Sequence, residues 1–135
     1  GVNTDITERK ETELALAEES ERLHLAQEAA SIGVWEMRLE SRKLYWAPEL
    51  YRLWSRDPAL GPPNRDEFLR MIHPDDVTAS IAAVDGVKPG DVYNGEFRVR
   101  GPDGGWRWLA SRARLLPDGA GGFRWLGINI DISDR

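Results

Sequence analysis

Cysteine is absent from the 135-residue chain. This absence excludes disulfide bonds, thiol catalysis, zinc fingers and cysteine-ligated clusters, and it fits a reducing compartment such as the cytoplasm. No apolar run approaches the roughly eighteen residues that a bilayer-spanning helix needs, and residues 1–30 are acidic and lack the apolar core of a signal peptide. We therefore expect a cytoplasmic segment that makes no contact with a membrane.

An excess of basic charge is also missing. The net charge is −5, and residues 1–30 account for all of it, with eight acidic residues against three basic ones. Acidic and basic residues balance in 31–135, so bulk charge offers no surface to phosphates. Nucleic acid is therefore not an expected partner. The 41% apolar and 30% charged residues are typical of a folded globular domain.

The two ends of the chain repeat one another. Residues 1–9, GVNTDITER, return as residues 127–135, GINIDISDR, with most positions identical or exchanged for a close chemical relative. A repeat whose period is near the length of a domain indicates tandem modules. We therefore predict two parts: residues 1–30 contain the end of an upstream module and a linker helix, and residues 31–135 form one domain.

Residues 7–30 contain no glycine or proline, which predicts a long helix with Thr7 as its N-cap. Leu16, Leu23 and Ala30 are spaced by sevens and start an apolar stripe. The residues that broaden this stripe are Leu14, Leu25, Ala26 and Ala29. Such a helix suits packing on its own domain along one stretch and on a partner helix along another. A simple amphipathic helix on the domain surface is the alternative.

The rest of the pattern is two strands, a group of helices and three more strands. Alternation and turn residues predict strands at 34–39 and 43–46, then helices at 48–54, 66–72 and from 74 to just before 86, then strands at 91–100, 106–116 and 123–132. This order predicts an α+β fold with one antiparallel sheet and helices on one of its faces.

Five segments of residues 31–135 carry motifs in a specific order. They are Ile32–Glu36, Leu44–Leu50, Ile72–Asp76, Asp103–Leu109 and the closing Gly127–Ser133. Together they resemble the PAS family, in the form found in bacterial sensor kinases and cyclic-dinucleotide enzymes, and the last one resembles its C-terminal PAC motif. The resemblance covers nearly all of the predicted domain.

This resemblance implies a five-stranded antiparallel sheet with short helices on one face, preceded here by the long flanking helix. It implies a sensory and signal-transduction module of a multidomain receptor, such as a two-component sensor histidine kinase or a cyclic-dinucleotide enzyme. The alternative is a ligand-free dimerisation and transmission module with a filled core. No catalytic residue is expected, because the chain offers no nucleophile paired with a base, no metal cluster and no phosphate loop.

The alternation assigns sheet faces once Asn129 is placed inward, as the matching position is in flavin-binding relatives. Trp125 then also points inward, as do Leu109, Ser111 and Phe97 on neighbouring strands. These five residues are the expected lining of a pocket, in which Asn129 and Ser111 would orient an unidentified small ligand. The alternative is that these two polar groups satisfy backbone atoms or buried water. No cofactor is predicted.

Leu126, Ile128 and Ile130 would then point outward as an apolar row that needs cover. We expect the helix stripe with Leu16 and Leu23 to supply this cover, from the same chain or from a second subunit. The row is therefore the sequence argument for a homodimer that uses the N-terminal helix and the outer face of the sheet.

Asp131, Ile132 and Ser133 end the last predicted strand and are the expected signal relay to adjacent domains of the receptor. We expect Asp131 to fix the strand end by hydrogen bonds and Ser133 to cap a following helix.

Two residue types have competing interpretations. His73 is either an axial haem ligand or the first residue of a His-Pro-Asp-Asp helix start, and we prefer the helix start. The six tryptophans either stack on a planar ligand or fill the core. The light-sensing branch of the family needs a cysteine beside its flavin, so the lack of cysteine excludes that adduct and leaves non-covalent flavin open.

Overall fold

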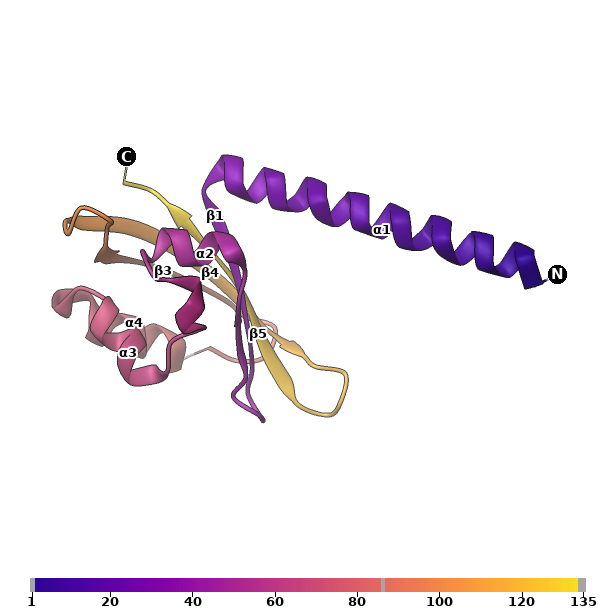
Figure 1. Cartoon of the computed structure of the whole chain (residues 1–135). Coiled ribbons are helices and arrows are strands. Elements are labelled where there is room, and N and C mark those ends of the chain that lie inside the picture. Colours follow the sequence, from indigo (N-terminus) through magenta and orange to yellow (C-terminus); the bar gives the residue numbers. More distant parts are fainter. Residues whose placement is uncertain (1, 86, 134–135) are drawn as a thin grey trace. The chain divides into compact units, whose positions relative to one another are not determined.

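The computed structural model describes residues 2–85 and 87–133 and divides the chain into two compact units, Gly1–Ala30 and Ser31–Arg135. The first unit is the helix α1 (Val2–Ala30). The elements of the second unit are β1 (Ile32–Arg38), β2 (Leu44–Trp46), α2 (Pro48–Leu53), the 3-10 helix η1 (Pro58–Leu60), α3 (Arg65–Met71), α4 (Pro74–Asp85), β3 (Val92–Arg100), β4 (Trp106–Pro117) and β5 (Phe123–Asp131) (Figure 1).

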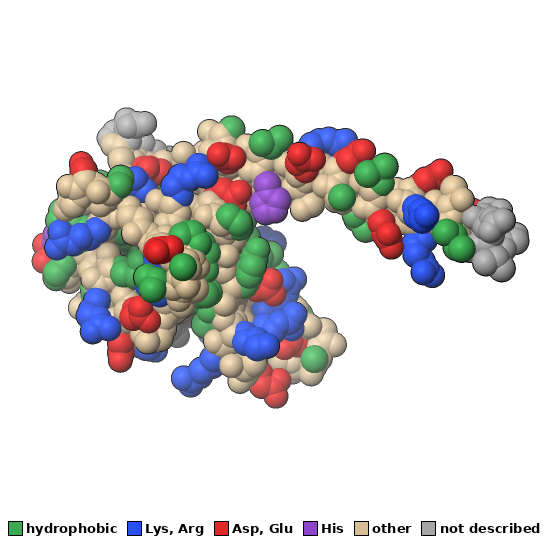
Figure 2. Space-filling view, in the orientation of Figure 1, with side chains coloured by type: hydrophobic (Ala, Val, Ile, Leu, Met, Phe, Trp, Pro, Cys, Tyr) green, Lys and Arg blue, Asp and Glu red, His purple; other side chains and the backbone are tan. Residues whose placement is uncertain are grey.

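Helix α1 is longer than its sequence predicts. It already includes Val2, so the predicted N-cap at Thr7 is wrong, and the helix runs through the repeated segment. Every described side chain of α1 except that of Gln27 is exposed, and charged and apolar groups are mixed along the visible side of the helix (Figure 2). Among the residues that the structure describes, no helix has the length and apolarity to cross a membrane.

The leucines of α1 do not form one stripe. Successive residues of an α-helix turn by about 100°, so side chains two positions apart point in nearly opposite directions. Leu14 and Leu25 therefore share one face, while Leu16 and Leu23 share the opposite face. The predicted single broadened stripe is wrong for this reason, and all four side chains are more than half exposed.

The second unit is an antiparallel sheet with strand order β2-β1-β5-β4-β3. The helices lie between β2 and β3 in the chain and gather on one side of the sheet (Figure 1). This architecture confirms the predicted α+β fold with five antiparallel strands. Strand β5 is central, with β1 on one side and β4 on the other. The residues of β5 therefore pair with a strand on each side.

Local sequence explains where the short helices begin. Pro48 occupies the first turn of α2, where its missing N–H costs nothing. Asn64 and Glu67 form a reciprocal capping box at α3, with Asn64 Oδ1 accepting from the Glu67 N–H at 2.8 Å. The pKa of Glu67 is lowered chiefly by its hydrogen bond with the Asn64 backbone. At α4, the Asp75 N–H donates to His73 Nδ1 at 3.1 Å, which confirms the preferred helix-start interpretation of that histidine.

Candidate functional site

One row of residues crosses the inner face of the sheet and places two polar side chains at its centre. Gly33 pairs with Asn129, Asn129 with Ser111, and Ser111 with Gly95 on four adjacent strands. Asn129 and Ser111 are only 3% and 5% exposed. A side chain on Gly33 would lie 2.6 Å from Leu50 Cδ1, so the missing side chain lets α2 approach the sheet closely.

The Asn129 side chain is bonded within the protein. The indole Nε1 of Trp54, directly after α2, donates to Asn129 Oδ1 at 2.9 Å, and both side chains are buried. Asn129 Nδ2 donates to the Ile128 carbonyl at 3.1 Å. The amide therefore ties the end of α2 to the central strand, because a buried polar pair of this kind is costly to break.

Aromatic rings fill the space around this hydrogen bond. The ring of Trp54 has its centroid 5.5 Å from Trp46, 5.2 Å from Phe68 and 5.5 Å from Phe97. Trp46 also makes an edge contact with Tyr51 at 5.3 Å. These geometries are those of favourable aromatic packing. Trp46 and Trp54 thus have the core-filling role that was one of the two interpretations of the tryptophans.

A second buried cluster lies at the other end of the inner face. It contains Tyr93, Ala113, Leu115 and Trp125. A side chain on Gly127 would overlap the indole of Trp35, which lies directly on the backbone of β5. Burial raises the pKa of the Tyr93 hydroxyl. This end of the inner face is therefore packed by side chains as well.

The five predicted pocket residues are all buried, as the alternation indicated, but they divide between the two clusters. Phe97 and Leu109 belong to the cluster around Trp54, whereas Trp125 belongs to the second one. Asn129 and Ser111 lie side by side across β5 and β4. Their role as a ligand-binding set stays a prediction.

The end of β5 is held by a network around Asp131. The Ser133 N–H donates to Asp131 Oδ1 at 2.9 Å, and Ser133 Oγ accepts from the Trp108 N–H at 3.0 Å. The Ile132 N–H donates to the Trp108 carbonyl, also at 3.0 Å. All three predicted relay residues therefore make hydrogen bonds with each other or with β4.

Arg107 connects this network to α2. Its Nε lies 3.4 Å from Asp131 Oδ2, and its Nη1 donates to the carbonyls of Leu53 at 2.7 Å and Arg52 at 3.1 Å. These carbonyls lie at the C-terminal end of the helix, where backbone acceptors are left without helical partners and favour a cation. Arg107 thus bridges the end of α2, next to Trp54, and the end of β5.

The two junctions of the domain lie next to each other. Ile32, at the start of β1, pairs with Ile130 near the end of β5. The Asp131 N–H donates to the Ser31 carbonyl at 3.3 Å. Ser31 is the single residue between α1 and β1, and it has a positive φ of 55°, which is uncommon for a residue other than glycine. The start of β1 and the end of β5 therefore lie together at one end of the sheet.

A further ion pair joins helix α4 to β3, which is an edge strand of the sheet. Asp76 at the start of α4 accepts from Arg98 Nη2 at 2.9 Å, from its Nε at 3.0 Å and from its backbone N–H at 2.8 Å. The Arg98 side-chain hydrogen bonds hold the pKa of Asp76 below its ordinary value. Asp75 and Asp76 thus serve the helix start and this edge contact. Within the described ranges, no group of acidic and histidine side chains has the arrangement of a metal site.

Sequence reasoning missed two contacts of this candidate site. It placed Trp54 in a helix and Asn129 in a strand but had no signal for the bond between them. Arg107 did carry a signal, because the alternation that turns Leu109 and Ser111 inward turns Arg107 the same way. A charged residue on an inner face needs a partner, and it has one in Asp131.

Comparison with known proteins gives a consistent result. The sequence model of a family described as "PAS fold" matches residues 43–129. A probable diguanylate cyclase of Escherichia coli K12 is 30% identical over 96% of this chain, which spans 12% of that protein. A blue-light-activated histidine kinase of Brucella ovis is 28% identical over 95% of this chain, which spans 26% of that protein.

Solved structures agree with the sequence matches. A sensory box histidine kinase/response regulator from Burkholderia thailandensis superposes with a TM-score of 0.65 at 33% identity, covering 84% of this chain and 86% of that one. A domain of a putative light and redox sensing histidine kinase from Haloarcula marismortui superposes at 0.64 with 24% identity, covering 83% and 98%. The latter supports the fold alone.

Proposed function

The chain belongs to the PAS fold family, and we propose that it is the regulatory module of a longer sensor protein, which relays a signal and catalyses no reaction itself. The relatives named as histidine kinases and as a diguanylate cyclase support one of these enzyme classes for the whole protein. Because the chain spans only 12% of the cyclase and 26% of the kinase, the output activity and a cytoplasmic location are parts of the proposal.

The continuous contact path from the core to the end of β5 carries this proposal. Asn129 holds Trp54, the carbonyl of the adjacent Leu53 holds Arg107, and Arg107 faces Asp131. The first two contacts are hydrogen bonds and the third is an ion pair, so we expect a shift of α2 to change the distances at the end of β5. A relay needs such a link between an element that moves and the segment that leaves the domain.

The packed core favours a module that transmits without a bound ligand. The side-chain oxygen of Asn129 accepts from Trp54, and the rings of Trp46, Phe68 and Phe97 pack around that indole. The ligand-binding sensor is the second candidate, because Asn129 and Ser111 are polar groups within an apolar interior. Absorption and native mass spectra separate the two: we expect no band beyond the tryptophan envelope, and a stoichiometric flavin or haem would establish the second.

Self-association is the other part of the proposal. Leu16 and Leu23 share one exposed face of α1, and Leu126, Ile128 and Ile130 form a half-buried row on the outer face of the sheet. Together they support a homodimer through the helix and this face. Removing residues 1–22 should shift the protein toward monomer in sedimentation velocity, and an unchanged dimer would place the interface elsewhere.

Removing the charge of Arg107 tests the relay. Arg107→Gln should speed hydrogen exchange at the Ile132 and Ser133 amides several-fold while the global transition persists. Arg124→Gln is a matched control. Arg124 also links two strands, through its ion pair with Glu36 at 3.1 Å, but it lies away from the end of β5.

In the full receptor, Asp131→Ala should uncouple output activity from the input state. Normal regulation in that variant would show that the junction only ends the strand.

A further inference from the structure

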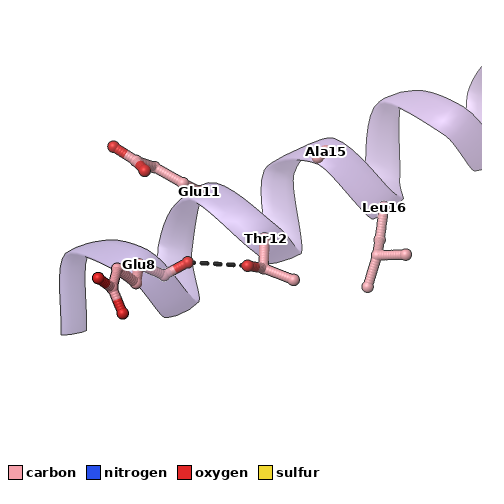
Figure 3. Close-up of a pocket in the computed structure, with 5 residues that line it drawn as sticks. All are labelled: Glu8, Glu11, Thr12, Ala15 and Leu16. Atoms are coloured by element: carbon pink, nitrogen blue, oxygen red, sulfur yellow. Dashed lines mark hydrogen bonds between the residues drawn. The ribbon is translucent and has the colours of Figure 1, made fainter. Parts of the chain in front are cut away.

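Asp76, in the first turn of α4, forms its side-chain hydrogen bonds outside its own helix. In the part of α1 that Figure 3 shows, by contrast, the drawn bond is internal, because Thr12 Oγ1 donates to the Glu8 carbonyl at 2.9 Å. Asp76 accepts three hydrogen bonds from Arg98 of β3, a residue 22 positions away. The start of α4 is therefore bound directly to the sheet.

The start of α4 holds both the backbone and the side chain of Arg98. The Arg98 N–H donates to Asp76 Oδ2 at 2.8 Å, and the Arg98 carbonyl accepts from the His73 N–H, also at 2.8 Å. The guanidinium donates to both oxygens of Asp76, from Nη2 at 2.9 Å and from Nε at 3.0 Å. Two-pronged arginine–carboxylate bonds are strong and fix the geometry of the pair. The position of Arg98 therefore depends on that of the first turn of α4.

The same guanidinium lies over an indole ring on the next strand. Arg98 and Trp108 are direct partners of β3 and β4, and the guanidinium carbon is 4.9 Å from the centroid of the ring. A cation at this distance from the face of an indole is attracted to it. Trp108 is 40% exposed, so this contact replaces part of the packing that a buried indole would have.

The backbone of Trp108 is bonded to the residues that end β5 and follow it. Its N–H donates to Ser133 Oγ at 3.0 Å, and its carbonyl accepts from the Ile132 N–H at 3.0 Å. Trp108 thus contacts the partner of α4 through its ring and the exit of the domain through its backbone. The contacts from Asp76 to Ser133 are continuous.

Trp106, two positions earlier on β4, has similar surroundings without the connection to β5. It is also 40% exposed, and Arg100 lies over its ring at 4.7 Å. The ring of His73 is 4.4 Å away, so the start of α4 contacts this indole too. Arg100 Nη1, however, donates to the Gly104 carbonyl in the turn between β3 and β4 at 3.2 Å. This second arginine–tryptophan pair therefore provides an internal control.

We propose that α4 is a second input to the end of β5, with Asp76, Arg98 and Trp108 as the positioning residues that transmit its movement. The route from α2 arrives at Asp131, whereas this route arrives at Ser133, and the two share no side chain before that point. A displacement of either helix therefore acts on the same exit. This inference rests on the proposed relay and adds a regulatory element to it.

Hydrogen exchange of the Ile132 amide tests the inference, because this amide donates to the Trp108 carbonyl. Its rate is measured relative to that of the Arg114 amide within β4, so that a uniform loss of stability cancels. Arg98→Gln should raise this ratio several-fold. Arg100→Gln is the matched control, because it also removes an arginine from above a tryptophan, and it should leave the ratio unchanged.

A second pair of variants changes the rings instead of the arginines. Trp108→Leu keeps the backbone bonds of residue 108 possible but removes the ring that Arg98 contacts, so it should also raise the ratio several-fold. Trp106→Leu, at an equally exposed site, should leave it unchanged. An unchanged ratio in both Arg98→Gln and Trp108→Leu would overturn the second input.

Combining variants separates this inference from the proposed relay. Contributions of independent contacts add as free energies, so the increases caused by Arg98→Gln and Arg107→Gln should multiply in the double variant. A double variant that matches Arg107→Gln alone would reduce the two routes to one and overturn the second input. An effect of Arg107→Gln without one of Arg98→Gln overturns the role of α4 alone, and absence of both effects overturns the relay as well.

Discussion

The two copies of the repeated segment adopt different structures. Residues 2–7 lie in helix α1, whereas residues 128–131 lie in strand β5 between β1 and β4. Their sequences are nearly the same, so local propensity does not decide between them. The second copy has two strands to pair with, and this tertiary context selects the extended form. The segment therefore acquires its structure from its neighbours.

The largest expected effect comes from replacing the asparagine in each copy of the repeat with alanine. Asn129→Ala leaves the buried indole N–H of Trp54 without its acceptor, which should cost about 1–3 kcal/mol and lower Tm by roughly 4–12 °C. Asn3→Ala, the equivalent change in α1, should leave Tm unlowered because alanine favours a helix. Thermal unfolding followed by circular dichroism measures both. Equal losses would contradict the comparison.

Acid should weaken the domain through Asp76. Its pKa is lowered from the ordinary 3.8, so its ion pair stabilises the fold above that pH, and this stability is lost as pH falls through the native pKa. Asp76→Asn should therefore lower Tm at pH 7 by several degrees and flatten the decline of Tm below about pH 4. Parallel declines in the two proteins would remove Asp76 as the cause.

A smaller effect is expected from the aspartates of the two copies. Asp131→Ala removes the acceptor of the Ser133 N–H and the partner of Arg107, both near the surface, so Tm should fall by only a few degrees. Exchange of the Ser133 amide should nevertheless rise several-fold. Asp5→Ala should change neither quantity. Hydrogen exchange by NMR on both variants checks this, and an unaffected Ser133 amide would argue against a fastened junction.

Alternation predicted the strands, and it assigned the faces of the sheet once the family resemblance had placed Asn129 inward. The structure buries Asn129, Ser111 and Phe97, which lie on three neighbouring strands. The pattern of the elements likewise predicted the helices between β2 and β3. Strand and helix bounds differ by one or two residues in most elements, because chain ends depend on contacts that no local pattern records.

Contacts between distant residues were beyond local patterns. Trp54 and Asn129 are 75 positions apart, and only the packing of α2 on β5 brings them together. The start of α1 was missed because Thr7 is a good N-cap by type and the residues before it, 2–6, are weak helix formers, yet the helix already begins at Val2. The two-sided arrangement of the α1 leucines was readable from helical geometry.

The central claim is that the buried Trp54–Asn129 bond and the end of β5 are coupled. The most direct measurement is hydrogen exchange of the Ile132 amide in Trp54→Phe, which keeps a ring in the core but removes the donor. We predict that Ile132 exchanges about tenfold faster relative to the Arg114 amide within β4, while Trp106→Phe, at a 40% exposed site, leaves the ratio unchanged. An unchanged Ile132 ratio in Trp54→Phe would contradict the coupling.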